Sequence, residues 1–70
     1  MKVTVKPKFN AVKQNIEKFG DNRYLIYLPF EEDDEAADML KFVLSKYLGA
    51  PASRIEFIGK DANKDWIFEI

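Results

Sequence analysis

The sequence predicts a two-layer α/β (α+β) sandwich, in which a mixed sheet of about four strands is covered by one main helix. Three observations support this. Residues 33–51 form the only long helical pattern, most other apolar residues alternate with the period of strands, and the chain has only 70 residues. A chain of this length is one domain at most, here residues 1–70, and two layers are enough to bury one face of its sheet.

The segment 33–51, DDEAADMLKFVLSKYLGAP, contains signals for both ends of a helix. The acids at its start complement the helix dipole. Gly49 occupies the position of a left-handed C-terminal cap, and Pro51 follows it. A helical wheel places Phe42 on the polar side. The apolar stripe contains Ala36, Leu40, Val43, Leu44 and Tyr47.

Alternation predicts a first strand over residues 1–9, with Pro7 weakening it or placing it at an edge, because proline cannot donate to a strand ladder. The apolar run 24–28, YLIYL, indicates a central strand with both faces at least partly covered. Residues 54–58 and 65–70 predict two further strands, and the short turn between them indicates antiparallel pairing.

Residues 10–19 permit two interpretations. Val12, Ile16 and Phe19 are spaced for a short amphipathic helix, and the pattern leans slightly towards it. The same segment also fits a loop and a short strand that ends in a turn at Gly20.

Charge is unevenly distributed along a chain of net charge −1. Residues 1–24 hold six bases and two acids, whereas residues 31–38 hold six acids and no base. Such asymmetry is typical of an electrostatic interaction surface, and also of solvated faces. The acidic run lacks the alternating ligands and the glycine of a calcium loop, so we expect a solvated helix start and no metal site.

The chain has no histidine and no cysteine, and Thr4, Ser45 and Ser53 are its only small hydroxyl residues. The commonest general base, thiol nucleophile and zinc ligands are therefore absent. Glycine patterns that cradle phosphates are absent too. We expect no catalytic residues, no cofactor and no enzymatic activity. Because no apolar run is long enough to span a membrane, we expect a cytoplasmic protein that does not bind membranes.

Two sets of residues are candidates for binding. Phe42 and Trp66 are candidate partner-binding residues, and Phe42 either anchors a partner or a homodimer or packs beneath residues 9–19. The alternative is weak binding of RNA, with Tyr24 and Trp66 as stacking surfaces. Its candidate residues are Lys2, Lys6, Lys8, Lys13 and Arg23. Lysines on an edge strand also prevent aggregation, and this interpretation is favoured over nucleic-acid binding.

Several short motifs occur in a characteristic order. They are Val3-x-Val5-Lys6-Pro7, the strand at 24–28 ending in Pro29, Gly49-Ala50-Pro51-x-Ser53-x-Ile55-Glu56, and Gly59 before the last strand. In this order the chain resembles the YggU-like family of small uncharacterised α/β proteins over nearly its whole length. The resemblance implies a two-layer sandwich with a mixed sheet, in which residues 16–19 are extended. The family has no established biochemical activity.

The chain departs from this family at two polar segments. Where the family has P-P-x-x-G-x-A-N before the main helix, Asp34 replaces the glycine and Ala37 the asparagine. After Gly59, residues 60–65 replace an S-R-x-K-like pattern. If these positions form a ligand site in the family, this chain has largely lost or rebuilt it. The function is unknown, and the first hypothesis is a protein-interaction or accessory module with an unidentified protein partner.

Overall fold

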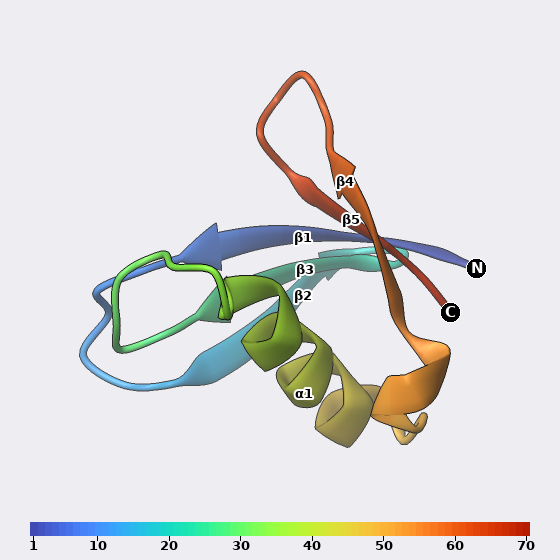
Figure 1. Cartoon of the computed structure of the whole chain (residues 1–70), viewed down its shortest axis with the longest axis horizontal. Helices are drawn as coiled ribbons and strands as arrows, with labels where there is room; N and C mark the ends of the chain where they lie inside the picture. The colour runs from blue at the N-terminus through green and yellow to red at the C-terminus, as the bar shows by residue number, and fades with distance from the viewer.

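The computed structural model describes residues 1–70 as an α+β domain with a five-stranded mixed sheet and one main helix (Figure 1). Its elements are β1 (Lys2–Lys8), β2 (Asn15–Gly20), β3 (Arg23–Tyr27), α1 (Ala36–Leu48), the short 3₁₀ helix η1 (Ala52–Arg54), β4 (Glu56–Lys60) and β5 (Trp66–Glu69). The strand order is β2-β3-β1-β5-β4, with β1 parallel to β3 and all other pairs antiparallel. The predicted class and the antiparallel final pair are confirmed, with five strands instead of about four.

The first strand is central, so the edge position, one of the two alternatives given for Pro7, is wrong. The Lys8 carbonyl accepts a hydrogen bond from the Leu28 N–H, which directs the backbone of Lys8 towards β3. Backbone groups alternate along a strand, so Pro7 is directed towards β5. Pairing with β5 ends at Val5 opposite Trp66, before it reaches Pro7. The missing N–H of Pro7 therefore removes no ladder hydrogen bond.

Residues 10–19 are not helical; the alternative of a loop followed by a strand is correct. Ile16 lies opposite Ile26 in the antiparallel β2–β3 pair and packs against the core. A helix over this short segment would be marginal, because forming its first turn is unfavourable without tertiary packing. Asn22, in the turn that joins the two strands, has φ 57°, a conformation that asparagine tolerates better than most residues.

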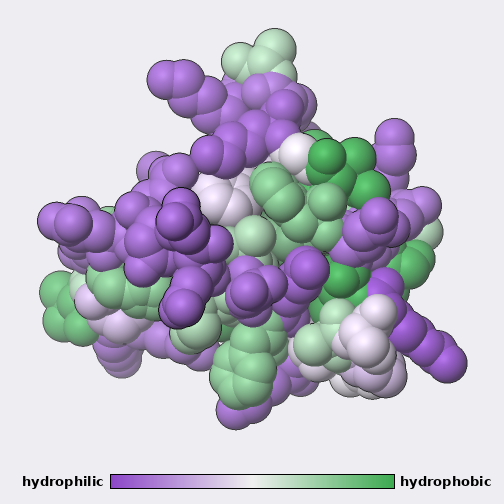
Figure 2. Space-filling view, in the orientation of Figure 1, coloured by the Kyte–Doolittle hydropathy of each residue, from purple (hydrophilic) through white to green (hydrophobic).

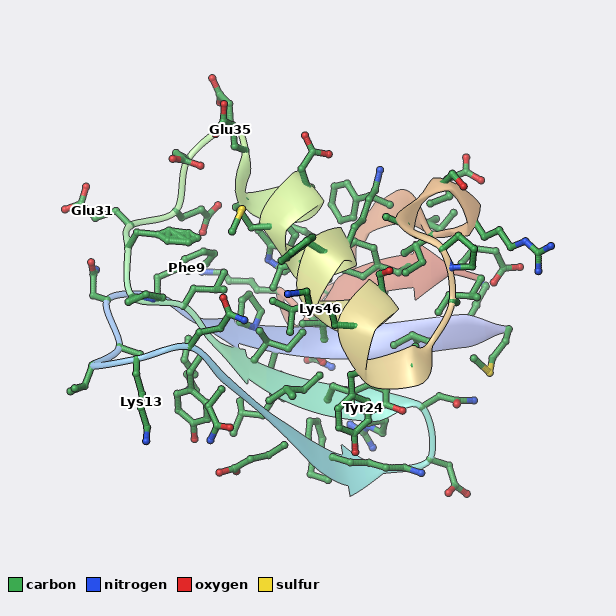
Figure 3. All side chains as sticks on the ribbon, turned by 90° about the horizontal axis from the view of Figure 1, so that it is seen from below. Phe9, Lys13, Tyr24, Glu31, Glu35 and Lys46 are labelled. Atoms are coloured by element: carbon green, nitrogen blue, oxygen red, sulfur yellow. The ribbon has the colours of Figure 1, made fainter.

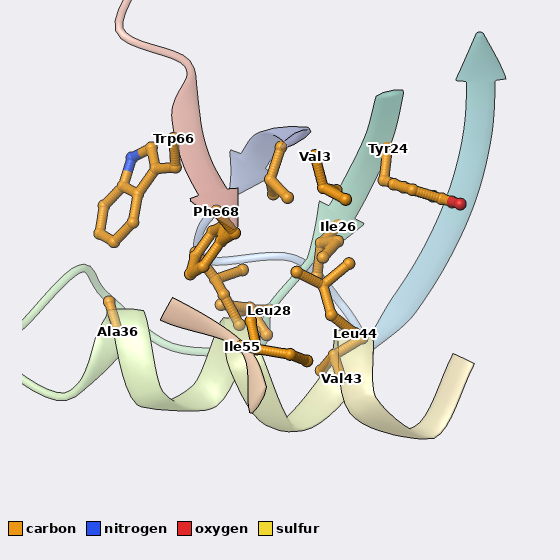
Figure 4. Packing of buried hydrophobic residues seen from close by; sticks show 12 residues of the cluster. Val3, Tyr24, Ile26, Leu28, Ala36, Val43, Leu44, Ile55, Trp66 and Phe68 are labelled. Atoms are coloured by element: carbon orange, nitrogen blue, oxygen red, sulfur yellow. The ribbon is translucent and has the colours of Figure 1, made fainter. Parts of the chain in front are cut away.

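The core lies between α1 and one face of the sheet (Figure 4). The helix contributes Ala36, Leu40, Val43 and Leu44 to this core. The strands and their flanking residues contribute Val3, Val5, Tyr24, Ile26, Leu28, Ile55, Trp66 and Phe68. Four of the five residues of the predicted apolar stripe are thus buried. The fifth, Tyr47, is half exposed, and its ring meets that of Tyr24 edge-on at 5.4 Å between centroids.

The two ends of α1 differ in how closely they match the sequence pattern. The left-handed cap is confirmed, because Gly49 has φ 73° and its N–H donates to the Ser45 carbonyl. The helix begins at Ala36, later than predicted, and only Asp38 of the acids lies in its first turn. Asp33 instead belongs to the preceding loop, where its Oδ1 accepts a hydrogen bond from the Glu35 N–H at 2.9 Å.

Candidate functional site

The face of the sheet opposite α1 is covered by no other element, and we call it the open face (Figure 1). Side chains alternate between the two faces of a strand, so the neighbours of the buried core residues point to this face. These neighbours are Lys2, Thr4, Lys6 and Lys8 on β1, Arg23, Leu25 and Tyr27 on β3, Asn15 and Glu17 on β2, and Ile67 and Glu69 on β5. Leu25, Tyr27 and Ile67 are only partly buried there. The second face of the 24–28 strand is thus partly buried by neighbouring side chains, although no helix covers it.

An acid in the turn before β5 neutralises one lysine of β1. Lys6 Nζ lies 3.0 Å from Asp65 Oδ1, and Asp65 is the only buried charged residue of the chain. Lys2 lies opposite Glu69 in the antiparallel β1–β5 pair, but the Glu69 carboxylate pairs with the N-terminal amine, 3.5 Å away. The centre of the open face is thus a mixture of paired charges and apolar side chains. Because β1 is central, the interpretation of its lysines as protection for an edge strand is wrong.

Lys8 and Lys13 lie beyond this neutralised region and take part in no ion pair. They line a shallow hollow of about 450 Å³ at the end of the open face. Its lining also contains Phe9, Ala11, Val12, Asn15, Glu17 and Tyr27. The loop that forms its wall is fixed by hydrogen bonds from the Asn10 N–H to the Phe30 carbonyl and from the Ala11 N–H to the Leu28 carbonyl. The hollow therefore brings two of the predicted cationic residues together.

Arg23 is not part of that group. It begins β3, whereas Lys8 ends β1 and lies beside Tyr27 at the other end of the same strand pair. The Arg23 guanidinium lies over the Phe19 ring, 5.2 Å from its centroid. The five residues predicted for nucleic-acid binding therefore do not form one continuous basic site.

The candidate partner-binding residues have different environments. Phe42 is exposed on α1, and Lys46 Nζ lies 4.5 Å from its ring centroid. The expectation that it packs beneath residues 9–19 is wrong, since those residues form β2 and its preceding loop. Trp66 is only 6% exposed, and Tyr24 only 3%, so neither offers a free stacking surface. Figure 2 shows exposed hydrophobic areas separated by hydrophilic ones in the orientation of Figure 1.

Trp66 instead forms the floor of a second hollow, which the sequence reasoning did not find. Its indole lies beneath Lys60, whose Nζ is 4.4 Å from the ring centroid and 3.0 Å from Glu32 Oε2. Phe9 packs on the other side of the hollow, 6.3 Å from Trp66 between centroids. The ion pair joins residues 28 positions apart, and no local pattern in the chain indicates it.

The remaining side chains form no recognisable catalytic or metal-binding arrangement. No group of three or more carboxylates in the structure is placed to hold a metal ion. Ser45 donates its hydroxyl hydrogen to the Ala50 carbonyl at 2.6 Å, which fixes the chain after α1. The role of Ser45 in the fold is therefore to connect the helix to the next turn.

Comparisons with protein-family models, with curated proteins and with solved structures found no match. The helix α1 has 13 residues, and none of the chain's helical structure is long and apolar enough to cross a membrane.

Proposed function

We propose that this chain is a protein-interaction module without enzymatic activity, and that its open face binds a partner protein. The observation that carries the proposal is the position of Leu25, Tyr27 and Ile67 on a sheet face that nothing covers. Apolar side chains together with polar ones on an uncovered face are typical of protein interfaces. The Lys6–Asp65 pair lies in the centre of this face, where Lys6 is opposite Leu25.

The composition and the geometry support a binding role over catalysis. Histidine and cysteine are absent, and the hydroxyl of Ser45 already donates to a backbone carbonyl. A binding module needs only a stable surface, which the five-stranded sheet supplies.

Weak RNA binding is the alternative, and the unpaired state of Lys8, Lys13 and Arg23 favours it. Binding through these cations would lose affinity steeply as salt is added, because it depends on the release of counterions from phosphates. The separation of Arg23 from the two lysines and the neutralisation of Lys6 argue against a strong site.

The test is capture from a nuclease-treated lysate of the source organism with the immobilised domain. Tyr27→Ala alters the open face, and Phe42→Ala, a matched aromatic truncation, alters the helix surface. We expect one set of proteins to be retained by the wild type and by Phe42→Ala, and lost with Tyr27→Ala. Capture that disappears after nuclease treatment supports RNA binding instead. Retention by Tyr27→Ala with loss in Phe42→Ala would move the site to α1.

Membership of the YggU-like family is also a proposal. The motif order described above supports it, as does the extended conformation of residues 16–19, which lie in β2. The open face would then be a surface to examine in other members.

A further inference from the structure

Opposite charges lie side by side at the end of the molecule formed by loops 9–14 and 28–35. A hydrogen bond from the Asn10 N–H to the Phe30 carbonyl, 2.9 Å long, joins the two loops. Figure 3 shows Lys13 on one side of this end and Glu31 on the other, with Phe9 between them. The lysines of the first hollow and the acids before α1 therefore form adjacent patches of opposite charge.

Most charges of the two patches lack partners within the chain. Lys8 and Lys13 make no ion pair, and both are exposed. Of the five acids at positions 31–35, only Glu32 pairs with a base, which is Lys60. No ion pair joins Lys13 to Glu31 within one copy, and both side chains are exposed to solvent.

We propose that this end of the molecule binds a second copy of the chain, with the acidic loop of each copy lying against the Lys8–Lys13 hollow of the other. A two-fold axis exchanges two adjacent complementary patches, so one such contact generates a second, identical one. A pair of copies thus satisfies both patches at once and leaves no open end for further growth. The proposal uses the loop end of the molecule and does not depend on a partner at the open face.

Val12 supplies an apolar element for this contact. It is fully exposed at the rim of the hollow, one position before Lys13. The backbone N–H groups of Asn10 and Ala11 hold the loop that carries Val12 in place. Binding therefore does not have to pay the entropic cost of ordering this loop. Packing of Val12 against the second copy would remove it from water.

The dimer is expected to be weak and dependent on salt. Its contact area is small, and exposed ion pairs contribute modestly, so we expect dimers at roughly millimolar protein concentration. Sedimentation equilibrium at low ionic strength should show self-association, which should disappear at about 1 M salt, where the Debye length is about 3 Å. A chain that is monomeric at about 1 mM and low ionic strength would overturn the proposal.

Charge reversal tests the pairing directly. Lys13→Glu and Glu31→Lys should each weaken dimerisation about tenfold or more, because two contacts per dimer become repulsive. The double variant should regain the wild-type affinity. Both positions are exposed, so the fold should survive, and amide spectra of the three variants would confirm this. Dimerisation that the single reversals leave unchanged, or that the double variant does not restore, contradicts the proposed geometry.

Matched controls lie on the remote part of the β2–β3 hairpin. Lys18→Glu and Asp21→Lys change the net charge by the same amounts at exposed positions near the turn between these strands. They should leave the dimer dissociation constant within about twofold of the wild type. An equal effect of these controls would show that net charge alone governs association, and the proposed contact would be wrong.

Discussion

Lys6 Nζ lies 3.0 Å from Asp65 Oδ1, so the central strand is joined by an ion pair to the residue that precedes β5. The Lys6 side chain is 43% exposed, whereas that of Asp65 is 6% exposed. Asp65 also donates its backbone N–H to Asp61 Oδ1, which fixes it at the closing end of the β4–β5 hairpin. The pair therefore joins strand pairing in the centre of the sheet to the geometry of its last turn.

Removing the cation of this pair should destabilise the domain more than removing both charges. Lys6→Met leaves the buried Asp65 carboxylate without its partner, and we expect a loss of about 2 kcal/mol in the free energy of unfolding, discounted for the exposure of Lys6. The double variant Lys6→Met/Asp65→Asn should recover part of this loss. Urea denaturation followed by circular dichroism measures both values. Equal stability of Lys6→Met and the wild type would show that the pair contributes nothing.

The hairpin turn contains a strained residue whose replacement should stabilise the protein. Lys64 has φ 64°, a left-handed conformation that glycine adopts without a steric penalty. Its N–H donates to the Asp61 carbonyl, as expected for a tight hairpin turn. Lys64→Gly should raise the free energy of unfolding by about 1 kcal/mol, measured by thermal unfolding. Lys64→Ala serves as the control, because it removes the charge and keeps the strain, and it should produce little of this gain.

The sequence predicted the helix, its apolar stripe, its cap and four strands, because each depends on residues near one another in the chain. The residue pattern left β2 open between a helix and a strand and leaned slightly towards the helix, since the burial of Ile16 depends on its position opposite Ile26 in β3. The central position of β1 was missed for a related reason. Pro7 would be unfavourable in a fully paired strand, and only the tertiary pairing shows that β5 ends before reaching it.

The candidate site was predictable only in part. Alternation places Lys2, Lys6 and Lys8 on one face, and the structure confirms this arrangement. The neutralisation of Lys6 was not predictable, because Asp65 comes next to Lys6 only when β5 pairs with β1. The burial of Trp66 was missed in the same way, since its cover comes from Phe9 and Lys60.

The cap of α1 offers a test that separates conformational strain from crowding. A Cβ atom at Gly49 would meet no other atom within 4 Å, yet the residue has φ 73°. Gly49→Ala should therefore destabilise the domain by about 1 kcal/mol through backbone conformation alone. Gly49→Asn should lose less, because asparagine tolerates this conformation better. Chemical denaturation of both variants is the measurement, and an Asn variant less stable than the Ala variant would contradict this explanation.

Truncation of two residues on opposite sides of α1 should change the free energy of unfolding by very different amounts. Leu40 is fully buried against the sheet, so Leu40→Ala should leave a cavity and destabilise the domain by about 2–5 kcal/mol. Phe42 is 46% exposed and contacts Lys46, so Phe42→Ala should change the free energy of unfolding by only about 0.5 kcal/mol.

Hydrogen exchange of the α1 amides, together with urea denaturation, distinguishes these effects. In Leu40→Ala the amides of residues 36–48 should exchange at rates that follow the lowered global stability, because the helix and the sheet share one core. In Phe42→Ala their exchange should stay close to that of the wild type. Rapid exchange of α1 in the wild type while the strands remain protected would show that helix and sheet unfold separately. Leu40 would then not be the contact that unites them.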